Sequence, residues 1–263
     1  MNQVAIVTGG TSGIGKATAL ALKASGCTVY EFSRRAQGVE GLHHIAADVT
    51  SEDSVRAAVA QVMDAEGRID ILVNNAGFGI SGAIEFTSTA DAKSLFDVNF
   101  FGMVNMNRAV LPVMRQQGGG RIVNMSSVAA PIAIPFQAYY SASKAAVRTY
   151  SLALASEVRP FGIEVCVIMP GDIATGFTAA RRKVSEGDDI YGGRISRSVA
   201  RMEHDEQTGM TAEFAGQFVA RCSTQKRAKL ICTMGHKYAL FVFLMRILPI
   251  GLTTRIVGRI YAS

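Results

Sequence analysis

The stretch "VAIVTGGTSGIGKATALALKASG", residues 4–26, decides how the rest of the chain is interpreted. Residues 4–8 are apolar or β-branched and predict a buried strand, whereas residues 13–26 have the spacing of a helix that ends at Gly26. Between them, Gly9, Gly13 and Gly15 permit a tight turn and a close approach of the backbone to a pyrophosphate. The free N–H groups at the start of the helix would face those phosphates.

Strands and helices alternate along the remainder of the sequence. Further strands are expected at 27–33, 43–49, 69–77, 121–127, 163–171 and 228–235, with helices at 51–67, within 91–117, at 139–162 and near 211–223. Nearly continuous apolar strands between helices predict a parallel sheet covered on both faces. The expected fold is therefore α/β, a doubly wound, three-layered single domain over residues 1–263.

Two segments depart from this alternation. Residues 176–208 are polar, charged and contain glycine, and they form either an ordinary surface insertion or a lid over a substrate site. Residues 238–263 form an apolar helical extension that Pro249 divides. The extension is expected to cover the substrate entrance or to pack against another subunit, and contact with a membrane interface is the less favoured alternative.

Composition excludes several classes of function. The net charge is +6, but the basic residues are scattered and form no nucleic-acid-binding motif, so no nucleic-acid partner is expected. The four cysteines lack metal-binding spacing, and no carboxylate cluster surrounds His43 and His44, so no metal site is expected. Without a targeting segment or a run of about 20 apolar residues, a cytoplasmic location is expected, with membrane association as the alternative.

Four motifs then occur in a fixed order: "TGGTSGIG" (8–15), "NNAG" (74–77), "YSASK" (140–144) and "PGDIAT" (170–175). With them the chain resembles the short-chain dehydrogenase/reductase family, well over residues 3–175 and more loosely over 211–235. The resemblance implies a Rossmann-like fold that binds a nicotinamide dinucleotide across the carboxyl edge of the sheet. The cofactor-binding residues that it implies are Gly9, Thr11, Ser12, Gly13, Ile14, Gly15, Ser33, Arg34, Asp48, Val49, Asn75, Ala76, Gly77, Tyr140, Lys144, Pro170, Gly171, Ile173 and Thr175.

The end of the second strand, "EFSRR" (31–35), bears on which dinucleotide binds. Ser33 stands where NAD-selective relatives carry an aspartate, and Arg34 follows it. Because a guanidinium suits the 2′-phosphate, NADP(H) is expected, with more weight on Arg34 than on Arg35. Glu31 lies two residues before Ser33 on the same strand face, and it leaves NAD(H) as the alternative.

The catalytic hydroxyl is expected to be Tyr140. Residues four apart on a helix face the same way, so Tyr140 and Lys144 share a face whereas Tyr139 does not. A phenol has a pKa near 10, and a nearby cation would lower that value. The resemblance implies that Ser127 orients the substrate oxygen, that Lys144 also binds the nicotinamide ribose, and that Asn99 holds a water in a proton relay.

The expected activity is NADP(H)-dependent interconversion of a carbonyl and a secondary alcohol by hydride transfer. Apolar side chains in the loop 128–138 (Ile132, Ile134 and Phe136), together with Phe78 and Phe177, favour a hydrophobic small molecule such as a steroid, retinoid or lipid-like ketone. One alternative is a 3-oxoacyl thioester on an acyl carrier whose acidic surface is attracted by the basic residues 181–183.

A non-catalytic NADP-binding sensor or scaffold is the alternative from another class. It is disfavoured because Asn99, Ser127, Tyr140 and Lys144 are all present. The family resemblance also implies a homodimer or homotetramer built through the helices near 91–117 and 139–160.

Overall fold

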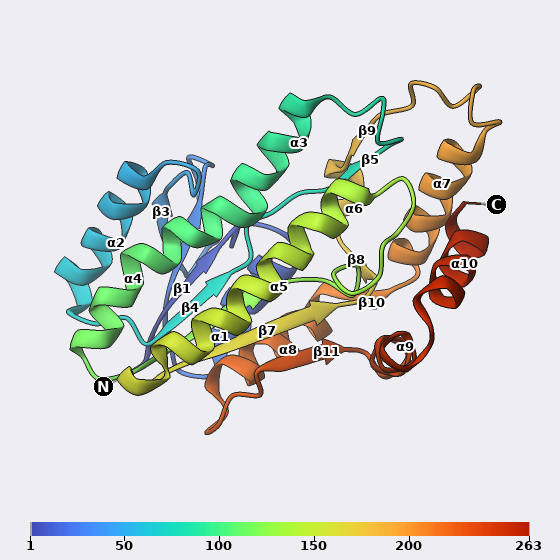
Figure 1. Ribbon diagram of the computed structural model, residues 1–263. Coiled ribbons are helices and arrows are strands. Elements are labelled where there is room, and N and C mark those ends of the chain that lie inside the picture. The colour runs from blue at the N-terminus through green and yellow to red at the C-terminus, as the bar shows by residue number, and fades with distance from the viewer. Residues whose placement is uncertain (1, 263) are drawn as a thin grey trace.

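Seven parallel strands form the central sheet of the computed structural model, which describes residues 2–262 (Figure 1). Their spatial order is β11-β7-β6-β4-β1-β2-β3. The strands are β1 (Val4–Thr8), β2 (Thr28–Ser33), β3 (His43–Ala46), β4 (Ile71–Asn74), β6 (Gly120–Met125), β7 (Ile163–Pro170) and β11 (Ile231–Met234). The order runs outward in both directions from the β1–β4 pair, so the expected doubly wound parallel sheet is confirmed.

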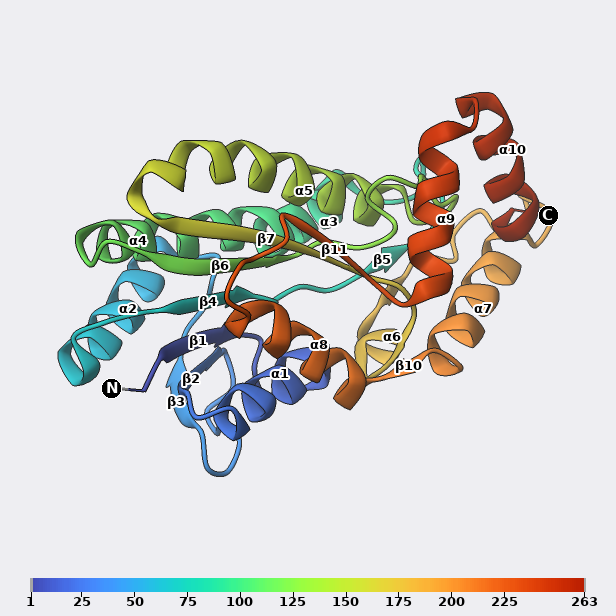
Figure 2. The same ribbon diagram turned by 90° about the horizontal axis from the view of Figure 1, so that it is seen from below.

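Helices cover both faces of the sheet (Figure 2). One face carries α1 (Gly13–Ala24) and α8 (Ala212–Thr224). The other carries α2 (Glu52–Glu66), α4 (Gly102–Gln116) and α5 (Ala138–Val158), the last ending in a 3₁₀ turn, η2 (Arg159–Phe161). The molecule therefore has the three layers that the sequence predicted.

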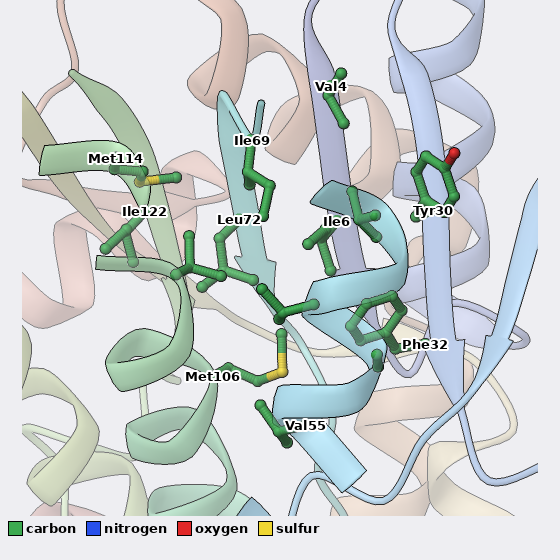
Figure 3. Close-up of a cluster of buried hydrophobic side chains, with 14 of the residues drawn as sticks. Val4, Ile6, Tyr30, Phe32, Val55, Ile69, Leu72, Met106, Met114 and Ile122 are labelled. Carbon is green, nitrogen blue, oxygen red and sulfur yellow. The ribbon is translucent and has the colours of Figure 1, made fainter. Parts of the chain in front are cut away.

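Alternation along the strands separates two cores. In β1, Val4 and Ile6 face the core under α2 and α4, which Figure 3 shows, whereas Ala5 and Val7 face the core under α1 and α8. All four are at most 2% exposed. A strand buried on both faces has to be apolar at every position, and this is why "VAIVT" could be identified as a central strand.

Several elements differ from their predicted bounds. The strand expected at 43–49 ends at Ala46, and the strand expected at 228–235 runs only from Ile231 to Met234. The strand expected at 69–77 ends at Asn74, because the backbone N–H groups of Asn75 and Ala76 leave the ladder and both donate to Thr8 Oγ1 (3.0 Å each). The single helix expected within 91–117 is α3 (Thr89–Phe96) joined to α4 by a π-helical turn, η1 (Asp97–Phe101). Such turns occur often at functional sites, and Asn99 lies in this one.

The segment 176–208 is folded against the rest of the protein. It contains α6 (Phe177–Ala180), β9 (Arg182–Lys183), which pairs with β5 (Ile80–Ser81), and α7 (Arg194–Gln207). Each of its three consecutive basic residues is paired with a carboxylate: Arg181 with Glu206, Arg182 with Asp91 and Lys183 with Glu203. The short strands β8 (Ile173–Ala174) and β10 (Met210–Thr211) pair where the segment leaves and rejoins the fold.

The C-terminal extension consists of α9 (His236–Ile247) and α10 (Ile250–Tyr261), with Pro249 capping the second helix. Figure 2 shows both helices at the end of the molecule toward which β7 points. Within residues 2–262, no helix is long and apolar enough to cross a membrane, and no group of histidine, cysteine or acidic residues is placed to hold a metal ion.

Candidate active site

A cavity of about 370 Å³ lies at the carboxyl ends of the strands, where the sheet order reverses between β1 and β4. Most of the residues implied by the sequence meet in its wall, although they come from separate parts of the chain. Those that line it are Gly9, Ser12, Gly13, Ile14, Asn75, Ala76, Gly77, Ser127, Tyr140, Lys144, Pro170, Gly171, Ile173 and Thr175.

The glycine-rich turn forms a cradle that fits a pyrophosphate. Gly9 and Gly13 have φ of 65° and 51°, values that a residue with a side chain rarely adopts. A Cβ on Gly15 would collide with the Gly9 carbonyl oxygen, so no side chain is tolerated where α1 meets the turn. The first turn of α1 contains no acidic residue, and Ser12 makes no side-chain cap. Its N–H groups and positive dipole end therefore remain available to an anion.

Hydrogen bonds from β4 hold this cradle in place. The Asn75 side-chain amide donates to the carbonyl oxygens of Thr8 (3.0 Å) and Gly9 (3.4 Å). Together with the contacts of Thr8 Oγ1 described above, these bonds tie the end of β4 to the end of β1, the two strands that flank the crevice.

The two arginines after β2 are placed differently. Arg35 lines the cavity, and its guanidinium donates to the Thr11 carbonyl at 3.4 Å. Arg34 is exposed and lies near Asp48 instead. The sequence favours Arg34 over Arg35 as the residue that meets the 2′-phosphate. The structure places Arg35 at the cavity instead, because the direction of each side chain at the end of a strand depends on the loop that follows.

Glu31 is fully buried beneath the glycine-rich turn. Its Oε1 contacts His44 Nδ1 at 2.6 Å, and a Cβ on Gly10 would meet its side chain. His44 is hydrogen-bonded to this carboxylate, and protein atoms cover it. Glu31 therefore does not line the cavity in which a ribose would bind.

Seven of the implied residues lie outside the cavity wall: Thr11, Gly15, Ser33, Arg34, Asp48, Val49 and Asn99. Asp48 Oδ1 accepts from the amide and the hydroxyl of Thr50 (2.9 and 2.8 Å). Burial raises the pKa of Asp48, but the two Thr50 hydrogen bonds and the Arg34 charge outweigh burial and leave that pKa lowered. Asp48 is therefore ionised and rigidly held.

The side-chain amide of Asn99 is hydrogen-bonded to the backbone of Phe78. Its Oδ1 accepts from Phe78 N (2.9 Å), and its Nδ2 donates to Phe78 O (3.0 Å) and Ser143 Oγ (3.2 Å). Asn99 and Val49 also line a separate small hollow of about 10 Å³, roughly the size needed for one water molecule. The relay role of Asn99 stays a prediction.

Tyr140 and Lys144 lie one turn apart on α5, as their spacing predicted. Lys144 Nζ is 5.7 Å from the centroid of the Tyr140 ring and donates to the Met125 carbonyl at 3.0 Å. Ser127, just beyond β6, makes a side-chain hydrogen bond with Tyr140. Ser126 Oγ donates instead to the Lys144 carbonyl (2.8 Å) and fixes the strand end to the helix. Tyr139 does not line the cavity, and its hydroxyl donates to the Ile84 carbonyl.

Burial controls the protonation of the Tyr140 hydroxyl and the Lys144 ammonium group. It raises the pKa of Tyr140 to about 12, although the Ser127 hydrogen bond and the Arg181 charge act to lower it. Burial also lowers the pKa of Lys144 to about 8. The spacing predicts that Lys144 lowers the pKa of Tyr140, but the charges that act on Tyr140 come from Glu206, Arg181 and Asp172, and the cost of burying a phenolate is the largest effect. Tyr140 therefore carries its proton at neutral pH and can act as an acid.

The apolar side of the cavity differs partly from the expectation. Phe78, Ile134 and Phe177 line it, but Ile132 and Phe136 are buried in adjoining cores. Phe136 adopts a φ of 58°, an uncommon conformation that costs on the order of 1 kcal/mol and directs its ring away from the cavity toward Tyr191.

Two carboxylates in the cavity wall were missed by the sequence interpretation. Asp172 follows β7, and its Oδ2 accepts from Tyr238 of α9 at 2.6 Å. Glu206 lies on α7, and its carboxylate accepts hydrogen bonds from Thr178 and Arg181. Asp172 lay within the quoted "PGDIAT" motif and could have been noticed there, whereas no sequence signal placed Glu206 near Tyr140. α7 thus contributes to the cavity, while its action as a lid stays a prediction.

Comparison with known proteins agrees with this geometry. The family model for short chain dehydrogenase matches residues 3–186. The 3-ketodihydrosphingosine reductase of Bacteroides thetaiotaomicron is 42% identical over 228 residues, covering 85% of this chain and 84% of that protein.

Two solved structures extend the likeness. A short-chain dehydrogenase from Streptomyces avermitilis superposes with a TM-score of 0.84 at 30% identity, covering 92% of this chain and 91% of that one. A 3-ketoacyl-(acyl-carrier-protein) reductase from Brucella melitensis complexed with NADH gives 0.74 at 25% identity, covering 88% and 96%. The chain therefore belongs to the short-chain dehydrogenase/reductase family and is an oxidoreductase that acts on CH–OH groups with NAD(P).

Proposed function

We propose that the protein uses NADP(H) to reduce the ketone of a long-chain substrate that carries an amino group beside the ketone, as 3-ketodihydrosphingosine does. One observation carries this proposal: the Asp172 carboxylate lines the catalytic cavity and, within residues 2–262, takes part in no ion pair. The charges of Lys237 and Arg181 act on Asp172 from beyond ion-pair distance, and a substrate ammonium would form the direct ion pair. The name of the 42% identical relative supports the same substrate class.

The position of Asp172 suits an amine next to the reacting carbonyl. Its charge and that of Glu206 both act on Tyr140, so both carboxylates lie near the catalytic hydroxyl. Arg181 already neutralises Glu206, whereas Asp172 has the Tyr238 hydroxyl as its hydrogen-bond donor. Burial raises the pKa of Asp172, and an ammonium beside it would lower that pKa again because it stabilises the carboxylate.

The protein's own residues would orient the ketone and supply a proton. Ser127 and Tyr140 hold the carbonyl oxygen, and the Tyr140 phenol, with its pKa of about 12, donates its proton to that oxygen as it gains negative charge. Lys144, with a pKa of about 8, is a buried proton source in the same wall. NADP(H), when bound along the cradle and the Asn75–Gly77 segment, supplies the hydride.

The preference for NADP(H) is supported by the two charged residues near the cradle. Arg35 borders the cavity and can meet a 2′-phosphate, whereas the Glu31 carboxylate is turned toward His44 and buried. Phe78, Ile134 and Phe177 would contact the hydrocarbon part of the substrate.

A 3-oxoacyl thioester on an acyl carrier has less support. The residues expected to attract the carrier, Arg181, Arg182 and Lys183, are each neutralised by a carboxylate, and Arg181 is also buried. Little free positive charge therefore remains there for an acidic partner.

The test is a comparison of initial rates of NADPH oxidation. The substrates are 3-ketodihydrosphingosine, the same ketone without its amino group, a 3-oxoacyl thioester, and steroid and retinoid ketones, each with NADH in parallel. We expect the highest kcat/KM with the amino ketone and NADPH. A higher kcat/KM with the thioester, or with a steroid or retinoid, would contradict the proposed substrate, and equal rates with NADH would contradict the cofactor preference.

A further inference from the structure

The helix α9 has apolar residues on two opposite sides. Phe241, Val242 and Met245 face inward and pack with Ile132 and Met169 of the cavity end of the fold. On the opposite side lies an outer stripe with the spacing i, i+3, i+4, i+7, and its side chains are 36–61% exposed. The outer stripe consists of Leu240, Phe243, Leu244 and Ile247. An apolar face of this kind requires a partner that is not water.

Exposed apolar side chains continue onto α10. Ile250 is 84% exposed, and Leu252 and Ile260 are 46% and 41% exposed. Of the fourteen large apolar side chains that are exposed in the described part of the chain, seven lie on α9 and α10. Single exposed apolar residues are normal on a protein surface, but their concentration on two consecutive helices indicates a binding surface.

The same helices carry only positive charge. Lys237, Arg246, Arg255 and Arg259 lie on them, and the sequence contains no aspartate or glutamate after Glu213. Arg246 and Arg255 are exposed, and within residues 2–262 neither takes part in an ion pair. The partner that fits this surface is therefore both apolar and negatively charged.

We propose that α9 and α10 dock the protein onto an anionic phospholipid surface, with the outer stripe inserted at the interface and the arginines at the level of the headgroups. A second copy of the chain fits less well. A two-fold contact would press this patch against itself and bring Arg246 and Arg255 of the two copies together, and neither residue has an ion-pair partner within residues 2–262. Anionic lipid supplies both the apolar medium and the opposite charge.

The docked helices would also lie beside the catalytic cavity. The inner side of α9 packs on the loop 128–138, and Tyr238 of the same helix donates to Asp172 in the cavity wall. Membrane docking would therefore bring the cavity close to lipid, where a long-chain substrate would be dissolved. The docking itself does not depend on the proposed substrate and is measured without turnover.

The experiment is vesicle flotation of the full chain. Phosphatidylcholine vesicles with and without phosphatidylglycerol are used, at low and at high salt. We expect binding to the anionic vesicles, weaker binding to phosphatidylcholine alone, and a loss of binding as salt rises. The double variant Phe243→Ser/Ile247→Ser should lower the partition coefficient about tenfold or more, because two exposed apolar side chains are removed from the interface.

A matched control removes two apolar side chains from elsewhere on the surface. Ile84→Ser/Ile190→Ser replaces residues that are 61% and 72% exposed, and it should bind vesicles like the unsubstituted protein. Thermal unfolding and NADPH binding verify that each variant is folded. Failure of the unsubstituted protein to float with anionic vesicles would overturn the proposal. Flotation of the Phe243→Ser/Ile247→Ser variant equal to that of the unsubstituted protein would also overturn it. So would a result in which the unsubstituted protein binds no vesicles but self-associates in light scattering, and only the Phe243→Ser/Ile247→Ser variant abolishes that self-association.

Discussion

Replacement of Asp172 by asparagine tests how the substrate is recognised. The side chain lines the cavity, and its Oδ2 accepts the Tyr238 hydroxyl at 2.6 Å. Asparagine has nearly the same volume and keeps a carbonyl oxygen for that hydrogen bond, so Asp172→Asn removes the negative charge and little else.

The size of the effect follows from the lost charge-assisted hydrogen bond to the substrate ammonium. Such bonds contribute about 1.5–3 kcal/mol, which corresponds to roughly 10- to 150-fold in kcat/KM. Asp172 is partly exposed to the cavity, so solvent screening favours the lower part of that range, about 10- to 30-fold.

The assay measures initial rates of NADPH oxidation at neutral pH with a long-chain 2-amino ketone and with the same ketone lacking the amine. For Asp172→Asn, kcat/KM should fall for the amino ketone and stay within about twofold for the amine-free ketone, because only the first substrate carries the charge. Asp53→Asn is the matched control, since Asp53 pairs with Arg56 on α2, outside the cavity wall. Its kcat/KM should change little with either substrate.

Two results would refute this reasoning. If Asp172→Asn slowed both substrates equally, Asp172 would support the cavity rather than recognise an amine. If neither substrate were affected, the carboxylate would play no part in binding. Reduced NADPH binding by the variant would identify structural damage and would be detected by fluorescence titration.

Three further predictions concern the cofactor and the catalytic pair. Tyr140→Phe should lower kcat about 10²- to 10⁴-fold, because the proton donor is lost, while fluorescence titration should show unchanged NADPH binding. Arg35→Ala should lower kcat/KM about tenfold or more with NADPH but little with NADH, and Arg34→Ala should have the smaller effect in the same rate assay; the reverse order would assign the phosphate to Arg34. Burial lowers the pKa of Lys144 from 10.5 to about 8, so between those pH values the unfolded chain binds more protons and stability rises with pH. Urea unfolding should show the free energy of unfolding rising by roughly 3 kcal/mol from pH 8 to 10.5 relative to Lys144→Met, and a parallel pH dependence of the two proteins would contradict the lowered pKa.

Local sequence predicted the parts of the site that depend on neighbouring residues. The glycine turn between β1 and α1, and the pairing of Tyr140 with Lys144 on α5, follow from the spacing along one strand or one helix. The strand alternation likewise predicted a sheet buried on both faces. The choice between Arg34 and Arg35 was less secure, because it depends on the path of an irregular loop.

The sequence by itself therefore determined the doubly wound sheet, the glycine-rich turn and the placement of Tyr140 one helical turn from Lys144, since these rest on periodicities that hold within single elements. Only the tertiary structure decided that Asp172 and Glu206 join the cavity wall, that Glu31 is occupied by His44, and that burial leaves Tyr140 protonated. It also decided which side of α9 faces the protein. Both sides of α9 are apolar, so the sequence pattern alone does not show which side faces the core. Packing against the loop 128–138 buries one side and leaves the outer stripe exposed to solvent.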